Sequence, residues 1–344
     1  MRKPPKNAQE MLPGYSEYRK ETELALERQQ TRLMELWKGG LSGERLFTAR
    51  LLIFSGLPIN ERKSTEPIET RKLDSVERKA QLADKTWLHV TFMQTNKQVP
   101  LPFRADRKMA YFLTNKAVLQ QSPILVWEYA NEYMRLFGMD PNSGKNYHDV
   151  QASFTRIAYM DIMVEHRDSN GKVLEHWKCP MIDHARISAE IDGEGNWKPS
   201  QSVAAMLAAQ QSVSFGLRFF SELQLNPVPI PIELILGADK KYRLMDYMIF
   251  LYWRAWAGQK ESFIPWRYLQ DQFDNEDANI WRWPENFKKA YFIMKSLPEP
   301  INQIRADINS AGLTVYPFPV GTTFFEGHPK LAFRKDLPAP DSKS

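Results

Sequence analysis

The chain has 344 residues, of which 43% are hydrophobic and 25% are charged, and its 46 Lys and Arg against 41 Asp and Glu leave a formal net charge of +5. This composition is typical of a soluble protein with about two domains, and the single cysteine excludes an intrachain disulfide framework and a CxxC metal site. The first ten residues lack the apolar core of a signal peptide. The longest apolar run, 247–253, is too short to span a membrane. We therefore expect a cytoplasmic protein without membrane contact.

The positive charge is concentrated in the first third of the chain. Residues 1–120 hold 22 Lys and Arg against 14 Asp and Glu, residues 121–200 hold 8 against 12, and residues 201–344 hold 16 against 15. A basic N-terminal region suits contact with phosphate groups. A solvated helix face has the same composition, so charge alone does not decide the function.

Residues 1–44 are predicted to form a disordered arm followed by a helix. Pro and Gly residues break the first 15 positions, and the helix runs over 16–38, from an N-cap at Ser16 to a Gly-Gly pair. Its sparse apolar positions indicate a surface helix or one that contacts a partner. The segment 58–80 is highly charged and breaks any strand pattern, so we predict a loop there.

Residues 45–195 carry the element order of a winged helix-turn-helix domain, preceded by an alternating strand over 86–92. The elements are a helix at 105–121, a strand at 124–126, helices at 127–137 and 147–160, and a hairpin that turns at Asp168, Ser169, Asn170 and Gly171. Asn-Gly is a strong hairpin signal because both residues accept the positive φ angles of a tight turn.

The same order recurs in residues 217–330, after a linker at 196–216. The elements are an apolar helix at 240–257, a strand at 264–266, a second helix over RYLQDQF, a third helix at 284–297 and a hairpin that turns at 309–312. Residues 331–344 are predicted to form a flexible tail. The predicted fold class is therefore α+β, mainly helical, with two tandem winged helix-turn-helix domains that carry β-hairpin wings.

No pattern in the sequence predicts an enzyme, a cofactor site or a metal site. The segment 138–145 departs from a P-loop, because five residues instead of four separate its glycines and Asn follows the lysine. The six histidines form no HExxH or Cys/His cluster, and the acidic residues at 271–277 are typical of a helix end and its solvated loop. We therefore expect no catalytic residues, no cofactor and no metal.

The third helix of the second domain has an apolar face and a basic face. The apolar stripe comprises Phe287, Ala290, Tyr291, Met294 and Leu297. The opposite face carries Glu285, Lys288, Lys289, Phe292, Lys295 and Ser296. Such a helix suits the DNA major groove, because core contacts hold it while long cations project outward, although amphipathic helices with three lysines are also common on solvated surfaces.

The third helix of the first domain carries fewer cations. Its inner stripe is predicted to comprise Val150, Phe154, Ile157 and Ala158. The residues predicted to face outward are His148, Gln151, Ala152, Thr155, Arg156 and Tyr159, with Lys145 just before the helix. Lys145 and Arg156 are the two firm cations among them.

The segment 101–165 resembles the RepA-type plasmid replication initiators. The features it shares with them are Leu101-Pro102, Arg107, the segments 113–118 and 133–138, and Gly144. The second half resembles the same family through 219–235, the LMDYMIFLYWRAW helix, 264–273 and 287–297, in that order. The resemblance covers about residues 45–325, although the VQASFTRIA helix is poorer in Arg and Gln than its counterpart in the family.

The resemblance implies binding to repeated sites in the double-stranded DNA of a plasmid origin, local strand opening, and recruitment of the host replication initiator and the replicative helicase. A sequence-specific transcriptional repressor without initiator activity stays open as the alternative, and so does self-association. The candidate DNA-binding residues are Arg282, Lys288, Lys289, Phe292, Lys295, Ser296 and Arg305 in the second domain, and Lys145, His148, Gln151, Thr155 and Arg156 in the first.

Overall fold

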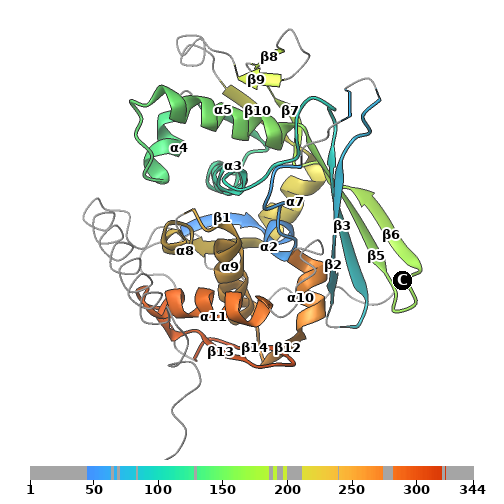
Figure 1. Cartoon of the computed structure of the whole chain (residues 1–344), viewed down its shortest axis with the longest axis vertical. Coiled ribbons are helices and arrows are strands. Elements are labelled where there is room, and N and C mark those ends of the chain that lie inside the picture. The colour runs from blue at the N-terminus through green and yellow to red at the C-terminus, as the bar shows by residue number, and fades with distance from the viewer. Residues whose placement is uncertain are drawn as a thin grey trace, which may run out of the picture.

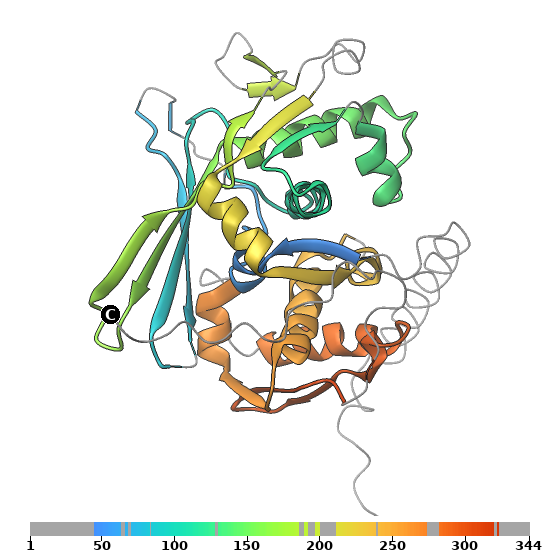
Figure 2. The same ribbon diagram turned by 180° about the vertical axis from the view of Figure 1, so that it is seen from behind.

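The computed structural model describes residues 45–62, 66–67, 70–82, 84–127, 130–185, 189–191, 197–199, 211–238, 240–273, 282–319 and 322. These residues form a mixed α and β fold (Figures 1 and 2). The helix predicted at 16–38, the tail predicted at 331–344 and the middle of the predicted linker, 200–210, lie outside the described residues.

The first half of the described chain contains a helical unit with a small sheet, which we call the N-terminal unit. Its elements are α3 (Asp106–Gln120), β4 (Ile124–Trp127), α4 (Ala130–Leu136), α5 (Gly144–Ala158), β7 (Ile182–Ala185) and β10 (Gln211–Phe215). The three strands are antiparallel, with β10 between β4 and β7. A short hairpin of β8 (Ala189–Ile191) and β9 (Trp197–Pro199) separates β7 from β10 along the chain.

The second half contains what we call the C-terminal unit. Its elements are α9 (Tyr242–Ala257), β12 (Ser262–Pro265), α10 (Trp266–Phe273), α11 (Arg282–Lys295), the 3-10 helix η2 (Ile301–Gln303), β13 (Arg305–Ile308) and β14 (Gly312–Tyr316). Its three strands form an antiparallel sheet with β14 in the middle. The helices, the strand and the hairpin predicted over 240–316 are thus present, close to their predicted bounds.

Two further sheets connect the units. The first is antiparallel, runs along one side of both units, and consists of β2 (Ser75–Gln81), β3 (Trp87–Gln94), β5 (Met160–Arg167) and β6 (Val173–Lys178). The second pairs β1 (Arg45–Ala49) with β11 (Pro227–Pro231) and lies between the units in both views. The remaining helices are α2 (Arg50–Phe54), α7 (Leu217–Leu225) and α8 (Ile232–Gly237).

The hairpin predicted as the wing of the first domain belongs to a different sheet. It forms where predicted, because Asp168 Oδ1 accepts hydrogen bonds from the amides of Asn170 and Lys172, and Gly171 adopts a φ of +85°. However, β5 pairs with β3, and the strand that pairs with β4 is β10, which falls inside the predicted linker. Turn chemistry predicts a hairpin locally, whereas the sheet that it joins depends on contacts between distant segments.

Part of the loop predicted at 58–80 is the strand β2. Alternate side chains of β2 are buried, namely those of Val76, Arg78 and Ala80. The inward arginine is satisfied because Arg78 Nε donates a hydrogen bond to the carbonyl oxygen of Gly56 at 3.3 Å. An arginine at an inward position hides the alternation on which strand prediction depends.

A buried ion pair joins the two units. Arg107 of α3 and Asp246 of α9 are 2% and 7% exposed, and 2.8 Å separates Arg107 Nε from Asp246 Oδ1. Arg107 also donates hydrogen bonds to the carbonyl oxygens of Arg104 at 2.6 Å and Leu57 at 2.7 Å. Burial raises the pKa of Asp246 to about 6, while Arg107 acts in the opposite direction. The contact couples the packing of α3 to that of α9.

Candidate nucleic-acid interface

Buried aromatic side chains hold helix α11 on its inner side. Trp283 and Phe287 are 1% and 0% exposed, and the Phe287 ring stacks on Tyr247 of α9 with 4.2 Å between the ring centroids. Pro284 lies in the first turn, where its missing N–H costs no helical hydrogen bond. Large apolar areas and close ring contacts stabilise such packing, so α11 is a firm support for the side chains on its outer side.

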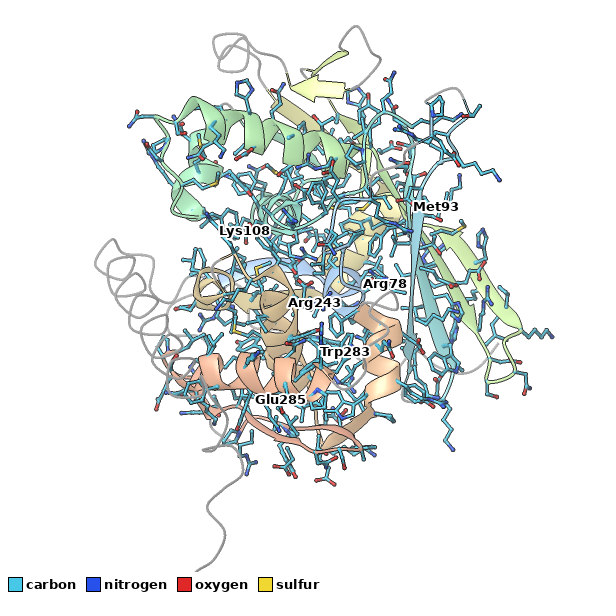
Figure 3. All side chains as sticks on the ribbon, in the orientation of Figure 1. Arg78, Met93, Lys108, Arg243, Trp283 and Glu285 are labelled. Atoms are coloured by element: carbon cyan, nitrogen blue, oxygen red, sulfur yellow. The ribbon has the colours of Figure 1, made fainter. Side chains whose placement is uncertain are left out.

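The outer side of α11 is basic and exposed, as predicted. We give the name α11 face to four residues of the helix and the serine directly after it; they are Lys288, Lys289, Phe292, Lys295 and Ser296, and all five are exposed. Arg282 and Glu285 at the start of the helix are exposed as well. The predicted apolar stripe is buried apart from Tyr291, which is half-buried. Figure 3 labels Glu285 and the buried Trp283 on this helix.

Two lysines of the α11 face have weak partners within the protein. Lys288 Nζ lies 3.0 Å from Glu285 Oε1, and Lys295 Nζ donates to the carbonyl oxygen of Asn302 at 2.8 Å. Lys289 has no partner among the residues that the structure describes. An exposed ion pair contributes about 0–1 kcal/mol, so an incoming phosphate competes easily with Glu285 for Lys288.

The hairpin of β13 and β14 lies beside the end of α11. The Tyr291 hydroxyl donates a hydrogen bond to the carbonyl oxygen of Ile304 at 3.2 Å. The next residue, Arg305, is exposed, and its Cζ lies 5.6 Å from the centroid of the Tyr316 ring. Tyr316 donates to Asp307 Oδ2 at 2.6 Å, and this hydrogen bond raises the pKa of the tyrosine. Arg305 is therefore placed next to the C-terminal end of the α11 face.

Sequence analysis missed the two residues that contact the second half of α11 from η2 and from the position directly after it. Asn302 and Ile304 act through their main-chain carbonyl oxygens. Every residue type supplies a carbonyl oxygen, so no signal in the sequence marks these positions.

The structure corrects three of the five DNA-binding residues predicted in the first domain. Gln151 and Thr155 are buried, at 2% and 0% exposure. Arg156 is paired with Asp106 of α3, with 2.6 Å between Nε and Oδ2, and its guanidinium lies 4.8 Å from the centroid of the Phe103 ring. Helix α5 packs against α3, α4, β7 and β9, so the side that helical periodicity placed outside is largely covered.

The other two predicted residues of the first domain lie at the start of α5. Lys145 is exposed and His148 is half-buried. The helix begins after Ser143, whose Oγ accepts a hydrogen bond from the amide of Asn146 at 3.4 Å. The exposed Asp149 lies beside them. This end of α5 therefore carries less net positive charge than the α11 face.

The described residues include a buried cysteine and a cavity, and they hold no candidate metal site. Within them, no group of three or more His, Cys, Asp or Glu side chains is placed to bind a metal ion. Cys179 is buried, and burial raises the pKa of its thiol to about 11. A cavity of about 1230 Å³ between the four-stranded sheet, α7 and β12 has a mixed lining of cations, carboxylates and aromatic rings.

Among known proteins, the chain is similar to two solved structures of RctB domains. No protein-family model matches the chain, and no curated protein matches it significantly. A crystal structure of domains 2 and 3 of RctB is similar, with 10% identity, a TM-score of 0.49, and coverage of 76% of this chain and 95% of that chain. A second structure of RctB domains 2–3 has 9% identity, a TM-score of 0.44, and coverage of 77% and 94%. None of the described helices has the length and apolar content that a bilayer crossing requires.

Proposed function

We propose that the chain is a replication initiator that binds double-stranded DNA at repeated sites in a plasmid origin. The observation that carries the proposal is the α11 face, in which lysines, a serine and a phenylalanine project from a helix whose other side is fixed by buried aromatic residues. A helix with this construction fits the major groove, which is about 12 Å wide. The resemblance of 101–165 and of the second half to RepA-type initiators supports the choice of an initiator.

Both units act as winged-helix domains in this proposal. Helix α11 enters the major groove, and the hairpin of β13 and β14 lies along the backbone or the minor groove, with Arg305 directed at phosphates. The N-terminal unit contacts a neighbouring groove through Lys145 and His148, or meets a second protomer. The element order of α9 to β14 and the position of Arg305 beside the α11 face support this division of labour.

The chain does no covalent chemistry in this proposal. Binding to several sites opens the neighbouring strands, and the host replication initiator and the replicative helicase are then recruited to the open region. No cofactor or metal takes part, so we expect no metal-dependent nicking of origin DNA.

Footprinting on the DNA that flanks the gene, at two salt concentrations and with competitor DNA, tests the proposal. We expect protection of regularly spaced repeats that survives competitor DNA and weakens at the higher salt concentration. Protection of a single promoter site indicates the repressor alternative instead. A strand-opening assay on supercoiled origin DNA separates the two functions, because only an initiator opens the duplex. No specific protection at either salt concentration would refute both.

A further inference from the structure

Phe292 differs in kind from its neighbours on the α11 face. Its side chain is 60% exposed, and its ring makes no aromatic or cation–π contact with the residues that the structure describes. Single exposed apolar residues are common on protein surfaces and need no explanation by themselves. The position of this one is the informative observation, because four polar or cationic residues surround it.

Phe292 lies at the centre of the α11 face. Residues three and four positions apart share one side of a helix, so Lys288 and Lys289 lie one turn before Phe292, and Lys295 and Ser296 one turn after it. When such a helix lies in the major groove, the peripheral cations reach the phosphates and the central side chain faces the base edges.

We infer that Phe292 is a specificity-determining residue that packs its ring against the C5 methyl group of a thymine in the major groove. The inference rests on the proposed function. On the major-groove edges of the unmodified bases, this methyl is the one bulky apolar group, because cytosine carries only a hydrogen at C5 and the edges otherwise present mainly hydrogen-bond donors and acceptors. A phenylalanine ring cannot satisfy a donor or an acceptor, so it favours thymine over the other bases. The lysines around it position the helix without choosing a sequence.

The test uses the full chain and a duplex recovered by selection from random sequences. Each thymine of the selected site is replaced in turn by uracil, which lacks only the C5 methyl group. For the unmodified chain we expect one position at which uracil weakens binding about fourfold, the ratio that loss of one buried methyl group gives. Phe292→Ala is expected to weaken binding to the thymine duplex and to bind the two duplexes equally. Phe292→Leu, which keeps an apolar side chain, is expected to keep part of the difference in affinity between the thymine and uracil duplexes.

Lys289→Ala is the matched control, because it removes an exposed cation next to Phe292. It is expected to weaken binding to both duplexes and to keep the fourfold ratio. A uracil effect of the same size in Phe292→Ala, or no uracil effect at any thymine in the unmodified chain, would overturn the assignment and leave the proposed function standing. A selection that recovers no preferred sequence would overturn the proposed function itself.

Discussion

Arg107 and Asp246 illustrate how much depends on single buried residues. Arg107 is 2% exposed, and Asp246→Ala removes the carboxylate that pairs with its guanidinium. Because an unpaired buried charge is costly, we expect the free energy of unfolding, measured in urea, to fall by about 3–5 kcal/mol. Glu285→Ala is the matched control, because it removes the exposed partner of Lys288, and we expect a loss below about 1 kcal/mol. Similar losses in the two variants would show that the buried pair has no special role.

Buried polar residues are also where sequence reasoning failed. Helical periodicity placed Gln151, Thr155 and Arg156 outside because polar side chains usually face water. Arg156 is accommodated instead by Asp106, a residue on another helix, and Thr155 bonds to the carbonyl oxygen of Gln151 at 2.9 Å. The Asp106 partner of Arg156 lies on α3 and is found only once the helices are packed together, so a helical wheel drawn for one segment does not reveal it. Thr155 is buried without a distant partner, because its hydroxyl bonds within α5 to the carbonyl oxygen one turn earlier.

Gly312 determines how closely β12 and β14 approach each other. A Cβ at this position would lie 2.4 Å from the carbonyl oxygen of Ile264, a main-chain atom that cannot move without displacing β12. We expect Gly312→Ala to cost about 1–3 kcal/mol in the free energy of unfolding. Gly144→Ala is the control, because no atom lies within 4 Å of the added Cβ, and we expect no loss and a gain of up to about 1 kcal/mol. Equal effects in the two variants would contradict the close approach.

The C-terminal unit could be predicted from the sequence because each of its elements has a local cause. Helix α9 is apolar nearly all round, α11 has a regular apolar stripe, and Asn309 Oδ1 accepts the amides of Ala311 and Gly312 in the turn. The sheet of the N-terminal unit could not be predicted, because β4 pairs with a strand that follows two intervening hairpins. The α11 face was predictable because it depends on the local apolar stripe, whereas the contacts of α11 with Asn302 and Ile304 were not, because they use main-chain carbonyl oxygens.

At the scale of the whole molecule, the two units differ in what their third helices expose. Helix α5 is packed on several sides and presents few cations, whereas α11 presents lysines on an open side. Net charge does not reveal this difference, because residues 201–344 hold 16 Lys and Arg against 15 Asp and Glu. The proposed contact with DNA depends on how charge is arranged on α11 and not on the net charge of the segment. We therefore propose that the C-terminal unit supplies the main contact.

The most direct test of this central claim is the salt dependence of the affinity for the selected duplex. It is measured for the unmodified chain and for a variant in which Lys288, Lys289 and Lys295 are all replaced by Ala. If all three lysines contact phosphates, the variant binds every sequence more weakly, and the slope of log affinity against log salt becomes shallower by about three. Lys145→Ala in the N-terminal unit is expected to change the slope by at most about one. A triple variant that is folded and keeps both the affinity and the salt slope of the unmodified chain would contradict the account.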